Sequence, residues 1–297
     1  MTAPVLADAL GPRGRRQARV ASVVASAVIV GLVILFVLRL QSKGQFESEL
    51  WKPFTLWAQW KFFLGGLVVT LKVAALAMTL SIVLGTLLAL GRLARSFAVR
   101  LPAIAFVEFF RGLPLYVLIL FCGYGLVEVG IEISKFQALV LGLTLYNSAI
   151  LGEVFRAGIL SLDRGQTEAA LAVGLGYWQS MLLVVVPQAF RRMIPAIVSQ
   201  LVTLLKDTSL GFVILVEDLL RRAQLAGGFF GNELQSVLVA AVMYIIVNYS
   251  ISRVARRLEI RQRRRYKAGA IQVTGVEDLA IVGAQAEAAQ IQATDRE

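Results

Sequence analysis

The sequence predicts an all-α integral membrane protein with about six transmembrane helices. Hydrophobic residues make up 58% of the 297-residue chain, whereas soluble domains are roughly 45–50% apolar. About 20 consecutive apolar residues cross the hydrocarbon core of a bilayer, and several runs approach that length, with arginines gathered at their ends. The expected spans are residues 20–40, 62–91, 103–127, 136–157, 187–215 and 234–252.

Composition excludes several classes of function. The chain has no histidine and a single cysteine, Cys122, which rules out histidine-based catalysis, histidine-ligated metal sites and an internal disulfide. No GxxxxGK(S/T) phosphate loop occurs, so any ATP must be bound by another chain. The net charge of +11 comes from arginines beside apolar runs rather than from a separate basic domain. We interpret it as membrane orientation and contact with anionic lipid, not nucleic-acid binding. We expect no catalytic residue, metal or cofactor in this chain.

The first expected span is an N-terminal helix. Residues 1–19 are polar and carry several arginines, and residues 20–40 are apolar. A signal peptide is the competing interpretation, but the apolar run is too long for a typical signal-peptide core and no clear small-residue cleavage site follows. We expect a retained helix after a cytoplasmic segment at 1–19. Residues 41–61 are then an outer loop whose tryptophans fit a membrane interface.

A basic loop separates the second expected span from the third. Three arginines lie between residues 62–91 and residues 103–127, which places this loop inside by the positive-inside rule. Small residues in the second span allow close helix approach. In the third span, Glu108 and Arg111 lie three residues apart on one helical face, so we expect them to pair.

A short polar helix is expected after the fourth span. Glu153 and Arg156 lie three residues apart near the end of that span. Asp163 followed by Gln166 then has the spacing of a helix N-cap with its reciprocal partner. Good helix formers and a face of small residues follow, and they predict a short helix over 163–178 that can dock into a groove on another protein.

The fifth span is interrupted by Lys206, Asp207, Thr208 and Ser209. A charge at the centre of a membrane helix costs about 2.5–3.5 kcal/mol on insertion scales. Two interpretations stay open: these side chains line a wet path, or they form a self-satisfied break that shapes the helix.

Helix geometry constrains the two charges of this interruption. Adjacent residues on a regular helix diverge by about 100°, so Lys206 and Asp207 cannot both face one ligand unless the helix is broken. One of them is expected to pair with a neighbouring span, at Glu153 or Lys72, while a following hydroxyl faces the path.

The C-terminal part is expected to return to the inside. Residues 217–233 form an outer loop, although Arg221 and Arg222 place positive charge there. A dense basic cluster follows the last span and marks the inside. Residues 258–297 are expected to be a cytoplasmic basic segment and a disordered tail. Both termini are therefore expected in the cytoplasm.

Residues 163–187 resemble the EAA loop of ATP-binding-cassette (ABC) importer permeases. The family pattern is E-A-A, a glycine and Ile-x-Leu-Pro; this chain has Glu168-Ala169-Ala170, Gly174 and Val-x-Val-Pro ending at Pro187. The resemblance implies a type I ABC importer permease fold over residues 62–257, with residues 163–178 as a cytoplasmic coupling helix. It assigns contact with the ATPase to Asp163, Gly165, Glu168, Ala169, Ala170, Gly174 and Pro187.

Other stretches resemble the permeases for polar amino acids within that family. Residues 108–114 read EFFRGLP against the family's EFFRGTP, and residues 205–210 read LKDTSL. The segment 147–159 resembles the one that leads into the EAA loop, and residues 44–54 with the extra first span resemble glutamate permease subunits. The substrate-path candidates are Lys206, Asp207, Thr208, Ser209, Glu153 and Asn147.

The resemblance also implies partners and a location. These are a cytoplasmic ABC ATPase dimer that carries ATP-Mg, a second permease subunit in a homodimer or heterodimer, and an extracellular substrate-binding protein, at a prokaryotic plasma membrane. The alternatives are a secondary amino-acid transporter, which needs its own ion-coupling site and often internal repeats, and a non-transporting membrane scaffold. Co-purification of an ATPase separates the first interpretation from both.

Overall fold

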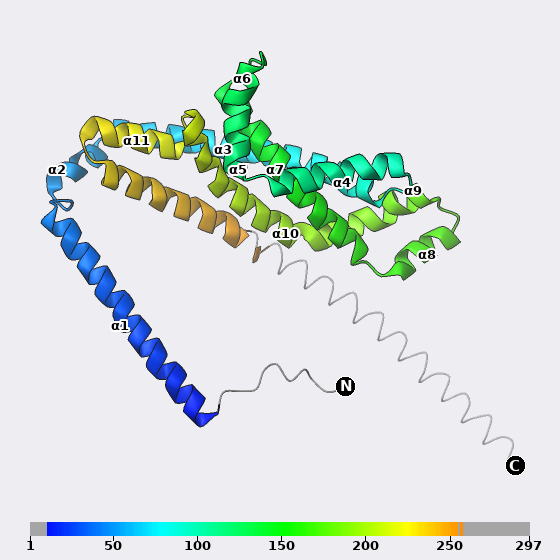
Figure 1. Ribbon diagram of the computed structural model, residues 1–297, viewed down its shortest axis with the longest axis horizontal. Coiled ribbons are helices and arrows are strands. Elements are labelled where there is room, and N and C mark those ends of the chain that lie inside the picture. Colours follow the sequence, from blue (N-terminus) through cyan, green and yellow to red (C-terminus); the bar gives the residue numbers. More distant parts are fainter. Residues whose placement is uncertain (1–10, 255, 258–297) are drawn as a thin grey trace, which may run out of the picture.

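The computed structural model describes residues 11–254 and 256–257, and these residues fold into helices joined by short connections, without a strand (Figure 1). The expected disordered tail at 258–297 and residues 1–10 lie outside the described part. The predicted all-α membrane fold is confirmed. The helices are α1 (Pro12–Ser42), α2 (Ser48–Trp51), α3 (Trp57–Leu93), α4 (Phe97–Gly112), α5 (Leu115–Leu120), α6 (Leu126–Glu128), α7 (Lys135–Leu160), α8 (Arg164–Ala172), α9 (Tyr177–Ser180), α10 (Val186–Asp207), α11 (Leu219–Phe230) and a last helix, Glu233–Val254.

Within the described residues, five helical stretches are long and apolar enough to cross a membrane. They are Arg16–Ser42, Trp57–Leu93, Lys135–Leu160, Tyr177–Ile214 and Glu233–Val254. The fourth of these joins α9 and α10 through a π-helical segment, Met181–Val185. That wider turn ends two residues before Pro187, whose ring and missing N–H would disturb a regular α-helical ladder.

The sixth stretch differs from the straight span expected near 103–127. It is broken, and α4 and the α5–α6 segment meet at 101°, so that α5 and α6 rise across the long axis of the molecule (Figure 1). The break falls at Leu113, which is extended, with φ −81° and ψ 135°. A residue that precedes proline is disfavoured in the α region, so Pro114 accounts for the bend.

The core is centred on the contact between α3 and α7. Gly85 of α3 lies against α7 so closely that an added Cβ would meet Leu151 Cβ at 3.0 Å and the Gly152 nitrogen at 3.1 Å. Further along α7, a Cβ on Gly158 would collide with the Met193 side chain of α10. Small residues at such contacts let helix backbones approach closely, which is the main source of packing energy between membrane helices.

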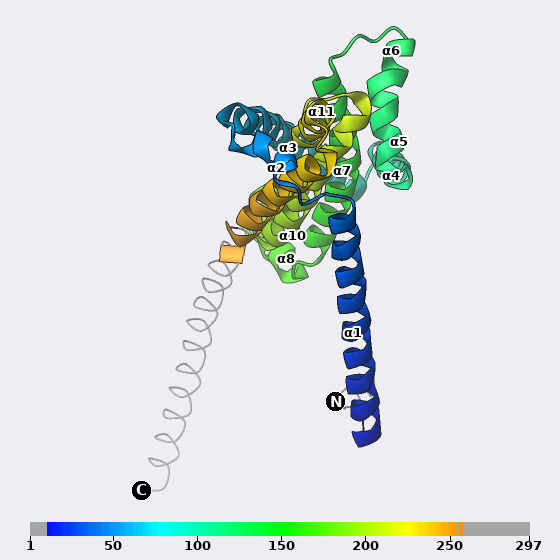
Figure 2. The same cartoon turned by 90° about the vertical axis from the view of Figure 1, so that its left-hand side faces the viewer.

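The first helix stands apart from this core. α1 contains no buried residue in its apolar window, and Figure 2 shows it standing away from the other helices. The expected outer loop at 41–61 contains α2 and the first turn of α3. This connection is held to the last helix and the turn before it, since Asn232 donates to the Leu50 carbonyl at 2.8 Å and Gln235 to the Gln45 carbonyl at 2.7 Å.

Candidate functional site

The predicted docking helix is α8, and it is shorter than the expected 163–178. Asp163 caps it, accepting a hydrogen bond from the Gly165 nitrogen at 2.9 Å. The reciprocal bond expected from Gln166 is absent. Instead, Gln166 accepts from Gln188 at 3.0 Å, which ties α8 to α10. The helix ends at Ala172, and the chain turns away at Gly174, whose φ of +88° lies in the left-handed region that favours glycine.

One face of α8 is open to a partner. Glu168 and Ala169 are exposed, and Val173, the residue that follows α8, is 79% exposed. Ala170, in contrast, is buried against the rest of the chain, so its role is to seat α8 rather than to touch a partner. Pro187, exposed near the start of α10, shapes the helix that follows α8 rather than α8 itself.

An ion-pair cluster lies at the same end of the molecule. Arg92 at the end of α3 reaches Glu108 of α4 at 3.3 Å and Glu153 of α7 at 3.0 Å. Glu153 also pairs with Arg156 at 2.5 Å, as the three-residue spacing predicts. The expected pair between Glu108 and Arg111 is wrong, because Glu108 turns to Arg92. We call these four residues — Arg92, Glu108, Glu153 and Arg156 — the Arg92 cluster.

The charged interruption coincides with a change of helix type. α10 ends at Asp207, and a tighter 3-10 helix, Thr208–Ile214, continues it. Thr208 is fully buried and donates to the Leu205 carbonyl, while Ser209 donates to the Lys206 carbonyl. The hydroxyls therefore satisfy themselves locally, which favours the break that shapes the helix.

Two expectations for substrate-path residues fail on geometry. Neither Lys206 nor Asp207 forms an ion pair with Glu153 or Lys72 within the described residues, because Glu153 is already held by two arginines. Asn147 does not face a path either. It is fully buried and accepts from Gln200 at 2.7 Å, which joins α7 to α10.

Lys206 and Ser209 instead line a groove between α10 and the last helix. Two adjoining pockets of about 190 and 530 Å³ share the Lys206 and Tyr244 side chains. Asn248 in this groove is 9% exposed, and its Oδ1 atom is buried without a hydrogen-bond partner. The sequence carried a signal for this face, since Tyr244, Asn248 and Ser252 recur every four residues.

A second polar assembly, also not foreseen, crosses the middle of the fold. Asp218 is fully buried, caps α11 by accepting from the Arg221 nitrogen at 2.8 Å, and accepts from the Tyr244 hydroxyl at 3.1 Å. Burial raises the pKa of Asp218 from 3.8 to about 6. The neighbouring Leu219 nitrogen donates to the Thr70 hydroxyl at 3.2 Å. Asp218, Thr70, Tyr244 and the Leu219 amide form what we call the Asp218 network, which connects α3, α11 and the last helix.

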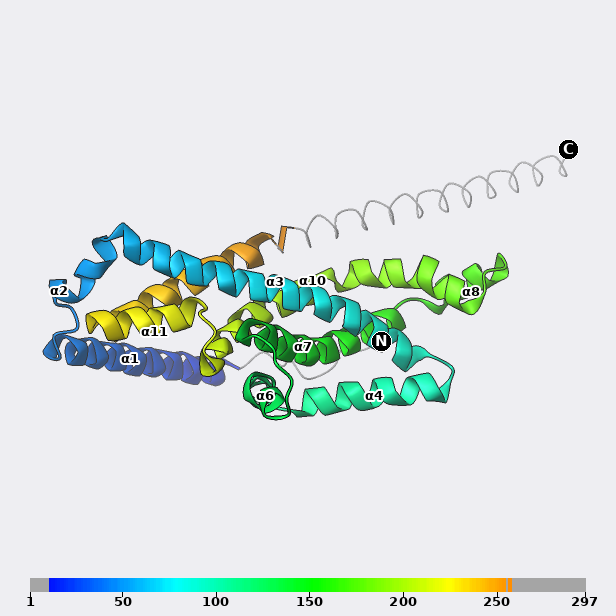
Figure 3. The same cartoon turned by 90° about the horizontal axis from the view of Figure 1, so that it is seen from above.

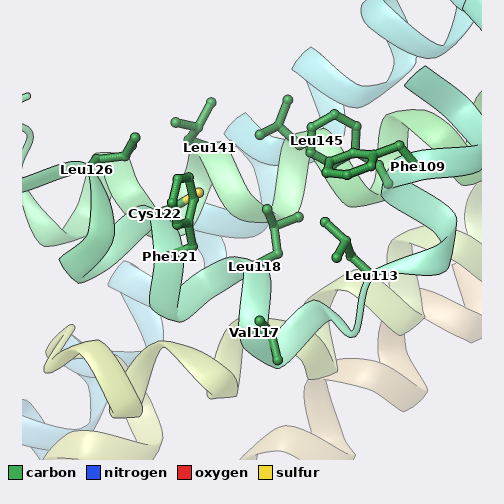
Figure 4. Close-up of a pocket in the computed structure, with 10 residues that line it drawn as sticks. Phe109, Leu113, Val117, Leu118, Phe121, Cys122, Leu126, Leu141 and Leu145 are labelled. Atoms are coloured by element: carbon green, nitrogen blue, oxygen red, sulfur yellow. The ribbon is translucent and has the colours of Figure 1, made fainter. Parts of the chain in front are cut away.

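An apolar hollow lies in the bend between α4 and α5. Its volume is about 330 Å³, and Phe109, Leu113, Cys122 and Leu145 are among the side chains around it (Figure 4). No polar surface lines it, so it has no group that could orient a charged solute. Its chemistry suits an acyl chain or apolar side chains.

Comparisons with known proteins agree with this architecture. A family model described as "Binding-protein-dependent transport system inner membrane component" matches residues 81–264. The probable glutamine ABC transporter permease protein GlnP of Bacillus subtilis is 42% identical over 204 residues, covering 68% of this chain and 94% of that protein. The glutamate transport system permease protein GluD of Corynebacterium glutamicum is 36% identical over 233 residues, covering 77% and 85%.

Solved structures show the same fold. A chain of an amino acid ABC transporter, crystallised with histidines, superposes with a TM-score of 0.63 at 31% identity, covering 69% of this chain and 94% of that one. A chain of the methionine transporter MetNI in an inward-facing conformation, at 21% identity and a TM-score of 0.59, supports the fold alone. The chain therefore belongs to the family of binding-protein-dependent transport system inner membrane components, the permease subunits of ABC transporters.

Proposed function

We propose that this chain is the permease subunit of an ATP-driven importer for polar amino acids, with glutamate or a related amino acid as the substrate. The observation that carries the proposal is α8, a short capped helix with an exposed small-residue face at one end of a membrane bundle. The relatives named for glutamine and glutamate transport support the substrate class. ATP-Mg is bound and hydrolysed by a partner ATPase, not by this chain.

The ATPase dimer docks on α8 through the exposed residues Glu168, Ala169 and Val173. Small side chains let a groove on the partner approach the helix backbone, and the aliphatic Val173 adds apolar area to the contact. Ala169→Arg and Val173→Asp should each reduce co-purification of the ATPase. Phe229→Asp is the matched control, since Phe229 is 82% exposed but lies on α11.

The α8 end faces the cytoplasm, and so do both termini. Arginines flank the spans on the α8 side and follow the last helix, which fits the positive-inside rule. The test is labelling by a membrane-impermeant thiol reagent in intact cells, after Cys122→Ser removes the native thiol. A cysteine at Gln179 should stay unlabelled and one at Gly130 should react; the opposite pattern would reverse the topology.

The groove beside Lys206 is the substrate path. An amino acid presents a carboxylate and an ammonium group, which the Lys206 ammonium and the free Asn248 Oδ1 atom complement chemically. Asp207, the next residue, is half-buried and does not line either pocket, so Lys206 supplies the charge in this groove. Lys206→Ala and Asn248→Leu should lower uptake of radiolabelled glutamate while the ATPase still co-purifies.

The remaining partners follow the family organisation. A second permease subunit, identical or homologous, completes the pathway, and an extracellular substrate-binding protein delivers the amino acid to the α11 end. Stoichiometric co-purification of an ATPase and binding-protein-dependent uptake are the expected results. Uptake driven by an ion gradient without any ATPase would support a secondary transporter, and absence of both activities would support a membrane scaffold.

A further inference from the structure

The turn that follows α8 leads along the chain into α9 and α10, but it is also attached to α3. Tyr177, the first residue of α9, donates a hydrogen bond from its hydroxyl to the Leu93 carbonyl at 3.4 Å. The Arg95 guanidinium lies 4.7 Å from the centroid of the Tyr177 ring, within the range of a cation–π contact. Leu93 is the last residue of α3, so α9 is fastened to the end of α3.

The same end of α3 holds two further helices. Arg92 precedes Leu93, and its side chain is only 13% exposed between Glu108 of α4 and Glu153 of α7. One guanidinium thus serves two carboxylates from different helices. A partly buried charge that loses its partner is costly, so α3, α4 and α7 must keep this arrangement together or exchange it for another.

α8 is coupled tightly to α9. After Gly174, the Leu175 nitrogen returns to the Ala170 carbonyl at 3.1 Å, which closes the turn. α9 then continues through the π-helical segment into α10 within one helical stretch, Tyr177–Ile214. A displacement of α8 therefore reaches α10 along the chain and reaches α3 through Tyr177. Figures 1 and 3 show α8, α9 and the ends of α3 and α4 gathered at one end of the molecule.

We infer that Tyr177, Arg95 and Arg92 form a positioning relay that carries movement of α8 to α3 and α4, in addition to α7 and α10, which the chain itself joins to α8. This inference rests on the proposed function, since it assumes that an ATPase moves α8. The three side chains do not touch substrate or nucleotide. They make four helices respond to one docking event, whereas the covalent connections of α8 alone would move α7 and α10.

The test is the ratio of amino-acid uptake to ATP hydrolysis in the assembled transporter in vesicles. Arg92→Gln removes the bridge to α4 and α7, and Tyr177→Leu removes the link to α3 while leaving the ion pairs intact. We expect each to lower the ratio by about fivefold or more, the low end of measured coupling between sites. Stimulation of hydrolysis by the binding protein should fall in parallel, with basal hydrolysis retained.

Three further variants separate positioning from folding. Tyr177→Phe keeps the ring over Arg95 and should retain most of the ratio, and Arg92→Lys should restore part of what Arg92→Gln loses. Arg253→Gln is the matched control, because Arg253 lies 5.6 Å from the Tyr249 ring in a similar contact on the last helix. It should behave as the wild type.

Two results would overturn the relay. If Tyr177→Leu keeps the wild-type ratio of uptake to hydrolysis, that result is enough to overturn the relay. It does so even if Arg92→Gln fails to assemble. If the wild-type chain co-purifies with no ATPase, the proposed function fails and the relay fails with it. Co-purification of the ATPase with the wild-type chain distinguishes the two failures, because it is lost only when the proposed function is wrong.

Discussion

The Arg92 cluster and the Asp218 network both join three helices, but they do so with different chemistry. In the Arg92 cluster, ionised groups at the end of the bundle meet through long side chains, and Glu108 remains 59% exposed. In the Asp218 network, a carboxylate, two hydroxyls and backbone amides meet around Asp218 and Thr70, which are fully buried. Ion pairs tolerate changes in distance and angle better than hydrogen bonds, whose strength falls steeply with misalignment.

This difference assigns different mechanical roles to the two regions. The Asp218 network fixes α11 and the last helix on α3, because any displacement would leave buried donors unpaired. The Arg92 cluster permits movement at the end where a partner docks, since water and alternative arginines can take over a released carboxylate.

Replacement of Asp218 should have the largest effect on stability. Asp218→Ala removes the acceptor for the Arg221 amide and for the Tyr244 hydroxyl, so we expect a loss of about 2–3 kcal/mol in the free energy of unfolding. The measurement is thermal or denaturant unfolding of the purified chain in detergent. Asp218→Asn, which retains the cap, is the control and should stay close to the wild type at pH 7. Equal stability of all three proteins would remove the network as a structural anchor.

Acidification should stabilise the wild type through the same residue. Burial raises the pKa of Asp218 from 3.8 to about 6, so the folded state binds this proton more tightly than the unfolded state. The stabilisation is complete below the unfolded pKa and is lost as the pH rises through about 6. Between pH 7 and pH 4, the wild type should gain about 2 kcal/mol relative to Asp218→Asn. Subtracting the unfolding free energy of Asp218→Asn from that of the wild type at each pH cancels the titration of other groups. A difference that is the same at pH 7 and pH 4 would contradict the raised pKa of Asp218.

Glu153→Gln should have a smaller effect that depends on salt. The substitution weakens the pairs with Arg92 and Arg156, and partly exposed ion pairs contribute about 1 kcal/mol or less. The loss in unfolding free energy should shrink further in 1 M salt, where the Debye length is about 3 Å. The loss caused by Asp218→Ala should not change with salt. If salt changes both losses in unfolding free energy to the same extent, the two regions do not differ in the way proposed.

The sequence was sufficient for the spans that are apolar without interruption and for the helix with a cap and a terminal glycine. Prediction from the sequence fails where tertiary contacts decide which of several possible partners a polar side chain bonds to. Glu108 has an arginine three residues ahead, yet it bonds to Arg92 because α3 ends beside α4. Likewise, the sequence predicts that Asp218 lies in a loop, because a single polar residue does not reveal that Tyr244 lies beside it. Pro114 explains the 101° bend, but the apolar content of this stretch alone predicts one straight span.

The smallest expected effect separates the observed pairing from the one that spacing predicts. Arg111 is exposed and has no ion pair within the described residues, so Arg111→Gln should change the unfolding free energy by no more than about 0.5 kcal/mol. Glu108→Gln should cost slightly more, because it removes a partner from the largely enclosed Arg92 side chain. In a double-mutant cycle, Glu108 should couple measurably to Arg92 and not to Arg111. Coupling to Arg111 instead would restore the pairing along α4, and it would leave Arg92 with Glu153 as its one acidic partner within the cluster.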